Sequence, residues 1–158
     1  MTSSVQEEIE TLVTSRSETT IRVRYAETDQ MGIVYYGNYF TWFEIGRVEL
    51  CRLLGFEYKR METEDDSFIV VAEASCRYKR PARFDDLLTI RTRVVESQRR
   101  TVRFGYEILN GGELIATGET LHVICDSKGR PKSLPEKYKK YFAPHDGRHR
   151  AAHEPHSD

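Results

Sequence analysis

The sequence predicts an α+β fold, in which a roughly five-stranded antiparallel sheet wraps around one long helix. Three observations predict it. Apolar residues recur with the period of a helix between residues 38 and 54, stretches of period two lie before and after that segment, and the later stretches are separated by short turns. Parallel strands need long crossover connections, which such turns cannot provide. The sheet is therefore expected to be antiparallel, with the helix covering its apolar face.

The first strand is predicted from an alternation of side chains near residue 20. Ile21, Val23 and Tyr25 alternate with two arginines, which is the period of a half-buried strand. Residues 1–18 before it are polar, and we expect them to form a leader outside the domain.

A single amphipathic helix is predicted from Asn38 to Leu54. Asn38 is a residue type that commonly caps helix N-termini, and Gly55 suits the left-handed conformation that ends many helices. The charged segment 57–66 is expected to be a loop or an irregular helix. The apolar positions of the long helix recur at spacings of three and four residues, at Tyr39, Phe43, Gly46, Leu50 and Leu53.

Four further strands are predicted after the helix. Side chains alternate between two faces in the runs 70–78, 88–94 and 102–108, and a last run, 114–125, is apolar on parts of both faces. The sequence Asn110-Gly111-Gly112 is a strong signal for a tight hairpin between the last two strands.

The C-terminal segment 143–158 is expected to be disordered, because it combines prolines and a glycine with very few apolar side chains. His145, His149 and His153 keep a spacing of four residues, which on a helix would place metal ligands on one face. The neighbouring prolines and glycine disfavour a helix there, so we expect no metal site. The predicted domain thus spans residues 19–142.

Composition excludes several classes of protein. With a formal net charge of −1, the chain has no overall positive field that would draw it onto nucleic acid. Cys51, Cys76 and Cys125 lie in apolar segments without the spacing of metal ligands, which indicates buried, reduced thiols. No apolar run is long enough to span a membrane, and the N-terminus lacks the basic start of a signal peptide. We therefore expect a cytoplasmic protein.

The most informative stretch runs from Arg22 to Tyr39, between the first strand and the helix. Asp29 lies just past the strand and shortly before the helix N-terminus. Free backbone N–H groups and the positive end of the helix dipole at that terminus favour an ionised carboxylate and can polarise a carbonyl group. A carboxylate beside such donors suits acyl transfer.

This stretch also resembles a known family. Arg22-Val23, Thr28-Asp29, Gly32-Ile33-Val34 and Asn38-Tyr39 are similar to the signature of the hotdog-fold acyl-CoA thioesterases, in particular the 4-hydroxybenzoyl-CoA thioesterase family and its YbgC-like branch. The resemblance implies the hotdog fold and hydrolysis of an acyl-CoA thioester to the free acid and CoA. It implies no cofactor, since CoA is part of the substrate, and it implies a homodimer or a homotetramer. Acyl carrier protein stays open as a second acyl donor.

The resemblance also implies roles for individual residues. Asp29 matches the essential carboxylate, either as the nucleophile or as a general base, and the sequence does not choose between the two roles. A backbone N–H near Tyr36 or Gly37 would stabilise the oxyanion. Tyr25 matches a tyrosine of the YbgC-like branch and could orient Asp29. Tyr36 departs from that branch, which commonly carries histidine at this position, so assistance by a general acid is not implied.

These residues also have plainer explanations. Asp29 could simply cap a turn, and the rings of Tyr25 and Tyr36 could pack in a core or an interface. Glu44, inside the predicted helix, is a rival base, because another hotdog lineage uses a helical glutamate.

The phosphates of CoA require cations. Arg80 and Arg83, in the turn around Pro81, are the expected contacts, although solvated turns carry arginine in many proteins without such a role.

Two other functions fit the same fold. A hotdog dehydratase would pair a histidine with a helical acid, but His122, the only histidine of the predicted core, lies outside any matching motif. A non-catalytic acyl-CoA-binding regulator would need a separate effector or DNA-binding segment, and residues 1–18 are too short for a helix-turn-helix.

Overall fold

The computed structural model describes residues 16–144, which form one sheet with a long helix across it. The strands are β1 (Arg16–Arg22), β2 (Phe68–Tyr78), β3 (Leu87–Ser97), β4 (Thr101–Asn110) and β5 (Glu113–Cys125). The helices are α2 (Asn38–Leu54), α3 (Tyr58–Asp65) and α4 (Glu136–Lys139), with the 3-10 turns η1 (Tyr25–Glu27) and η2 (Lys140–Phe142). Most of the expected leader and tail lies outside the described residues, as do His145, His149 and His153.

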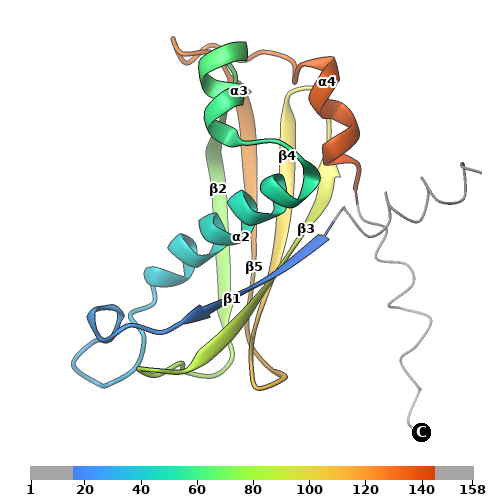
Figure 1. The fold of residues 1–158 in the computed structure, drawn as a ribbon. Helices are drawn as coiled ribbons and strands as arrows, with labels where there is room; N and C mark the ends of the chain where they lie inside the picture. The colour runs from blue at the N-terminus through green and yellow to red at the C-terminus, as the bar shows by residue number, and fades with distance from the viewer. Residues whose placement is uncertain (1–15, 145–158) are drawn as a thin grey trace, which may run out of the picture.

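The sheet has the strand order β1-β3-β4-β5-β2, and every neighbouring pair is antiparallel. Helix α2 lies across one face, α3 and α4 lie at one end of the sheet, and the loop before α2 lies at the other end (Figure 1). The predicted α+β architecture, with an antiparallel sheet around one long helix, is confirmed. The strand order leaves β1 and β2 as the two edges.

Strand β1 differs from the prediction at both ends. It begins at Arg16, inside the expected leader, and pairs with β3 along its whole length. It ends at Arg22 rather than at Tyr25, because the backbone turns into η1. The carboxylate of Glu27 stabilises this turn by accepting a 2.8 Å hydrogen bond from the backbone N–H of Arg24. Tyr25 is therefore 77% exposed instead of half-buried.

Helix α2 has the predicted bounds. Gly55 follows it in the left-handed conformation, with a φ of 99°, as expected. The N-cap position belongs to Gly37 rather than to Asn38, which is the first helical residue. The Asn38 side chain instead donates a 2.8 Å hydrogen bond to the backbone carbonyl of Glu27. This bond ties the beginning of α2 to the loop that precedes it.

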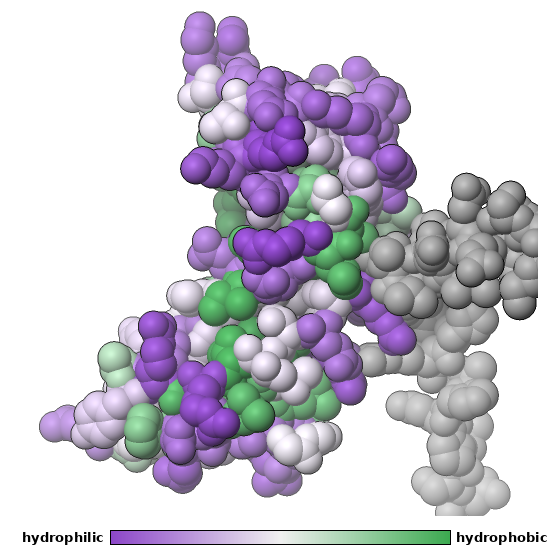
Figure 2. Space-filling view, viewed as in Figure 1, coloured by the Kyte–Doolittle hydropathy of each residue, from purple (hydrophilic) through white to green (hydrophobic). Residues whose placement is uncertain are grey.

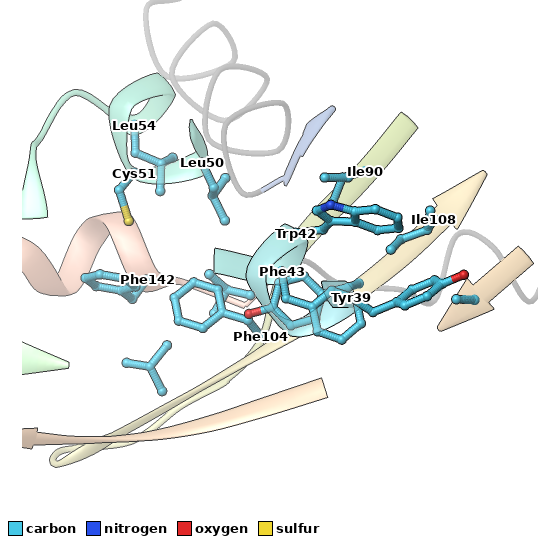
Figure 3. Close-up of a cluster of buried hydrophobic side chains, with 14 of the residues drawn as sticks. Tyr39, Trp42, Phe43, Leu50, Cys51, Leu54, Ile90, Phe104, Ile108 and Phe142 are labelled. Atoms are coloured by element: carbon cyan, nitrogen blue, oxygen red, sulfur yellow. The ribbon is translucent and has the colours of Figure 1, made fainter. Parts of the chain in front are cut away.

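The core lies between α2 and the sheet (Figure 3). Gly46 lets the helix approach β3 closely, because a Cβ at this position would lie 2.2 Å from Thr92 Oγ1. The helix therefore rests directly on the strand. The large buried side chains around this contact are Tyr39, Trp42, Phe43 and Leu50 from α2, with Ile90, Phe104 and Ile108 from β3 and β4.

Strand β2 is less buried than its alternation predicts, because it is an edge strand that pairs only with β5. Its large apolar side chains Val70, Val71 and Tyr78 are between 45% and 49% exposed. All three cysteines are free thiols, and Cys51 and Cys125 are buried as expected. The expectation of burial is wrong for Cys76, which is half-buried because it lies on this edge.

The hairpin at Gly111 and the segment after α2 agree with the predicted pattern, whereas α4 and η2 were not predicted. Gly111 and Gly112 have positive φ angles of 58° and 85°, so the tight hairpin between β4 and β5 is confirmed. The charged segment after α2 forms helix α3, which buries Met61 against the rest of the fold. None of the helices between residues 16 and 144 combines the length and the apolar character that a membrane crossing needs.

Candidate active site

Asp29 lies in a narrow hairpin between β1 and α2. Thr28 and Val34 form an antiparallel bridge across this hairpin. The backbone N–H of Asp29 donates to the carbonyl of Ile33 at 2.8 Å, and the N–H of Gly32 donates back to the carbonyl of Asp29 at 3.0 Å. Gly32 has a φ of 77°, a conformation that glycine adopts without strain, so the tight turn depends on it.

The loop between β2 and β3 fixes this hairpin from the other side. Ile33 and Arg83 form an antiparallel bridge, and the N–H of Val34 donates a 2.8 Å hydrogen bond to the carbonyl of Ala82. Both loops lie at the same end of the sheet (Figure 1). Two segments far apart in the sequence thus hold Asp29 in place together.

Only one of the two carboxylate oxygens of Asp29 accepts a hydrogen bond from the described part of the chain. One oxygen, Oδ1, accepts a 2.8 Å hydrogen bond from the backbone N–H of Met31, so the turn-capping role is real. Among residues 16–144 the other oxygen has no protein partner, and the side chain is only half-buried. The turn therefore orients the carboxylate and leaves one oxygen available for chemistry.

Two free backbone donors lie at the start of α2. The N–H of Tyr35 donates to Glu27, and the N–H of Asn38 donates to the carbonyl of Tyr35 at 3.0 Å. The N–H groups of Tyr36 and Gly37, which lie between them, have no acceptor within the described part of the chain. Such unpaired donors at the positive end of a helix bind anionic oxygen.

Glu27 is a structural residue of this site that the sequence patterns did not single out. It is 7% exposed, and its Oε2 accepts a 2.8 Å hydrogen bond from the indole Nε1 of Trp42. Its Oε1 accepts bonds from the backbone N–H and the side-chain Nε of Arg24, at 2.8 and 3.3 Å. Its backbone carbonyl accepts bonds from Tyr35 and Asn38. Glu27 therefore joins the Asp29 loop to the first turns of α2.

The electrostatics of Glu27 follow from these contacts. Burial acts to raise the pKa of its carboxyl group, because the charged form loses hydration. The hydrogen bonds from the backbone of Arg24, the indole of Trp42 and the side chain of Arg24 outweigh burial together, and the pKa lies below its usual value. Glu27 is therefore a buried, ionised carboxylate with specific donors around it.

The two tyrosines expected at the site have different surroundings. Tyr25 packs edge-on against Phe84, with ring centroids 5.6 Å apart, and its hydroxyl makes no hydrogen bond to Asp29 among residues 16–144. The ring of Tyr36 is 61% exposed and lies beside that of Tyr35, with centroids 4.6 Å apart. The structure thus places Tyr36 next to the free donors and Tyr25 against a different ring.

The two arginines expected to contact phosphates also differ. Arg80 forms an exposed ion pair with Glu113 at the start of β5. Arg83 bridges to Ile33 in the Asp29 loop, and its exposed side chain has no carboxylate partner within the described residues. Of these two arginines, Arg83 is therefore the one whose side chain is free of a carboxylate among residues 16–144.

The alternative candidates lie elsewhere. Glu44 is exposed on α2, well past the helix N-terminus. His122 is 1% exposed in the core and contacts Thr120 Oγ1 at 2.8 Å. His122 pairs with Val71 in β2, whereas Tyr78, at the other end of β2, contacts the loop of the Asp29 site. That separation is roughly 20 Å at about 3.3 Å per strand residue, so His122 cannot serve as the histidine of a dehydratase at this site.

Two hollows in the described part of the chain lie away from Asp29. One, of about 740 Å³, lies on the sheet face opposite α2 and is lined by charged strand residues such as Arg91, Arg93 and Glu119. Another, of about 480 Å³, lies near Phe56 and Tyr141 at the far end of α2. Within residues 16–144 there is no cluster of histidine, cysteine or acidic side chains that could hold a metal ion. Asp29 is half-buried, and its neighbours Met31 and Tyr36 are exposed, so the site lies at the surface of the single chain.

Comparisons with known proteins identify the family of this chain. The family model of the thioesterase-like superfamily matches residues 23–142. YneP of Bacillus subtilis (strain 168) is 38% identical over 113 residues, which cover 71% of this chain and 81% of YneP. The acyl-CoA thioesterase YbgC of Haemophilus influenzae is 32% identical over 124 residues, which cover 77% of this chain and 90% of YbgC.

A solved structure gives the same result. The crystal structure of a DHNA-CoA thioesterase from Staphylococcus aureus is similar to this chain with a TM-score of 0.75 and 34% identity, over 80% of this chain and 88% of that protein. Together with the sheet wrapped around α2, this likeness confirms the predicted hotdog fold. The chain therefore belongs to the thioesterase-like superfamily, as the signature around Asp29 indicated.

Proposed function

We propose that this protein hydrolyses acyl-CoA thioesters to the free acid and CoA, with Asp29 as the reacting carboxylate. The observation that carries the proposal is the state of that side chain. One oxygen is held by the N–H of Met31, and the other faces no protein donor within the described residues. The relative YbgC is named an acyl-CoA thioesterase, and the Staphylococcus aureus relative a DHNA-CoA thioesterase, which supports the same reaction here.

The free N–H groups of Tyr36 and Gly37 supply the second requirement of the reaction. A thioester carbonyl placed against them would direct its oxygen at the positive end of α2. The hydrogen bonds strengthen as negative charge develops on that oxygen, and one such donor is typically worth about 3 kcal/mol in the transition state. The two donors therefore stabilise the transition state of the attack more than they stabilise the bound thioester.

Asp29 can act by two balanced routes. As a nucleophile, its free oxygen bonds to the thioester carbon, the carbon–sulfur bond breaks, CoA leaves as a thiolate, and water then hydrolyses the mixed anhydride. As a general base, Asp29 takes a proton from water while the water oxygen bonds to the same carbon. The carbon–sulfur bond then breaks, CoA leaves as a thiolate, and the proton passes from Asp29 to it. Both routes consume one water and nothing else. A thiolate is a good leaving group, so the reaction does not need a general acid at position 36, where this chain has a tyrosine.

We further propose that the protein is a homodimer, in which two copies meet along their β2 edges, and that two dimers can form a homotetramer. An edge strand presents unpaired backbone groups, and Val70 and Val71 are half-exposed on this one. Apolar side chains also gather over the middle and lower part of the face shown in Figure 2. A partner at this edge would border the open Asp29 site. Light scattering should give a dimer or a tetramer, and a fully active monomer would contradict a shared site.

The proposal extends to the donor and the compartment. Acyl-CoA is the donor, with the phosphates of CoA directed to Arg83, and acyl carrier protein is the second donor to test. We place the reaction in the cytoplasm, since three free cysteines fit a reducing compartment.

The decisive experiment is a thiol-release assay across short, long and aromatic acyl-CoAs and an acylated carrier protein. The wild type should release free thiol and free acid, and Asp29→Asn should lower kcat by at least about a hundredfold. Glu44→Gln is the matched control, because it removes an exposed carboxylate from α2. Retained turnover in Asp29→Asn would refute the role of Asp29. A dehydrated product still joined to CoA would refute hydrolysis.

A further inference from the structure

The phenol of Tyr78 contacts the loop that presents the two free N–H groups. Tyr78 is the last residue of β2, and its Oη donates a 2.9 Å hydrogen bond to the carbonyl oxygen of Tyr36. The same oxygen accepts a longer bond, of 3.4 Å, from the N–H of Tyr39 in the first turn of α2. Tyr78 therefore supplies the shorter of the two bonds that hold this carbonyl.

The carbonyl of Tyr36 belongs to the same peptide unit as the N–H of Gly37. A trans peptide unit is planar, and its C=O and N–H point in opposite directions. Holding the oxygen of Tyr36 therefore sets the direction of the Gly37 N–H, which has no acceptor within the described part of the chain. Gly37 has no side chain that could hold the peptide unit by packing.

We propose that Tyr78 is a positioning residue for hydrolysis, which aims the N–H of Gly37 at the oxygen of the bound thioester. The inference rests on the proposed function, because the direction of the Gly37 N–H matters only if an acyl group binds there. Without the phenol hydroxyl, the longer bond from Tyr39 alone would hold the peptide unit, and the donor would spread over more directions. Oxyanion stabilisation depends on donors oriented before the charge develops, so the loss would fall on the transition state.

The ring of Tyr78 is held independently of its hydroxyl. It lies edge-on to Tyr39, with centroids 4.9 Å apart and an interplanar angle of 89°, and edge-on to Tyr36 at 6.4 Å. Tyr78→Phe therefore removes one oxygen and leaves the ring packing in place. Burial, with a contribution from Cys76, raises the pKa of the Tyr78 phenol above its usual range, so the hydroxyl keeps its proton during an ordinary assay.

The test compares Tyr78→Phe with Tyr39→Phe in the thiol-release assay. Tyr78→Phe should lower kcat about tenfold while KM changes less than about twofold and Tm changes by less than about 2 °C. Tyr39→Phe is the matched control. It removes a hydroxyl whose oxygen faces the backbone N–H of Ala82, and the carbonyl of Ala82 keeps its 2.8 Å bond from the N–H of Val34. This control should keep the kcat of the wild type.

Three results would overturn the inference. These are an unchanged kcat in Tyr78→Phe, an equal fall in both variants, and a rise in KM at constant kcat. The proposed function is judged separately in the same assay. If the wild type releases no thiol from any acyl-CoA, the function fails and the inference fails with it. If the wild type is active and Asp29→Asn is not, the function stands and the kcat of Tyr78→Phe alone decides.

Discussion

The indole Nε1 of Trp42 donates a 2.8 Å hydrogen bond to Oε2 of Glu27, across fifteen positions of sequence. Trp42 is buried in α2, and Glu27 lies at the beginning of the loop that carries Asp29. The bond therefore connects the core directly to the candidate active site.

Replacing Glu27 should weaken both the fold and the reaction. In Glu27→Gln the NH2 group of the new amide would face at least one of the N–H donors that bond to the carboxylate in the wild type. Two donors cannot bond to each other, so we expect the free energy of unfolding to fall by about 1–3 kcal/mol. The Asp29 loop would loosen, so kcat should fall as well. Urea unfolding and the thiol-release assay measure the two effects. Glu64→Gln, at an exposed pair with Arg60, is the control and should change stability by less than about 0.5 kcal/mol.

The same carboxylate should make stability depend on pH. The pKa of Glu27 in the folded state lies below its ordinary value of 4.5. The unfolded chain therefore binds the proton first, and the stabilisation is fully present above about pH 4.5 and is lost as the pH falls through the lower folded pKa. The slope of unfolding free energy against pH in this window should be smaller in Glu27→Gln. Equal slopes in both proteins would contradict the ionised state of Glu27.

His122 should make the free energy of unfolding depend on pH in a higher range than Glu27 does. Burial, with a smaller contribution from Arg47, lowers the pKa of His122 from 6.5 to about 3. The unfolded chain takes up this proton below about pH 6.5 and the folded chain does not, so stability should fall as the pH drops from 6.5 towards 3. Urea unfolding at several values between pH 7.5 and about 5 should show a flatter dependence in His122→Leu. An identical dependence would mean that the imidazole titrates normally.

The contact of α2 with β3 should tolerate no side chain at Gly46. An alanine would gain about 1 kcal/mol of helix propensity, but its Cβ would lie 2.2 Å from Thr92 Oγ1 and 3.1 Å from Ile90. Overpacking typically costs about 1–3 kcal/mol, so Gly46→Ala should lower Tm by several degrees. Because Thr92 Oγ1 is buried without a hydrogen-bond partner among residues 16–144, adding Thr92→Ala should restore part of the loss. A stabilised Gly46→Ala protein would refute the contact.

The two arginines on either side of Pro81, Arg80 and Arg83, should differ in their effects on KM. Arg83→Ala should raise KM for acyl-CoA about three- to tenfold with little change in kcat, because a phosphate contact is made equally in the ground and transition states. Arg80→Ala should change KM less, since Glu113 already pairs with Arg80. The comparison uses one acyl-CoA at one ionic strength. An unchanged KM in Arg83→Ala would remove this residue from the binding site.

The sequence predicts those parts of the fold that depend on local periodicity. Helix α2 and the hairpin at Gly111 were predictable because one apolar stripe and one turn type specify them. The end of β1 was not, because the carboxylate of Glu27 competes with the strand for the N–H of Arg24. A local pattern holds no information about such a side-chain contact.

The candidate site divides in the same way. The signature around Asp29 indicated the carboxylate and the helix start. The partners of Glu27, and the pairing of Arg80 with Glu113, depend on loops that meet only in the folded chain. A buried glutamate and a tryptophan fifteen positions later form no recognisable motif, so only the structure could join them.

Trp42 is the only tryptophan of the chain. Its indole therefore provides an intrinsic fluorescence signal located at the bond that secures the loop of Asp29. Emission that shifts before global unfolding would report a loosened loop, and emission that shifts only with it would show that the loop and the interior melt as one cooperative unit.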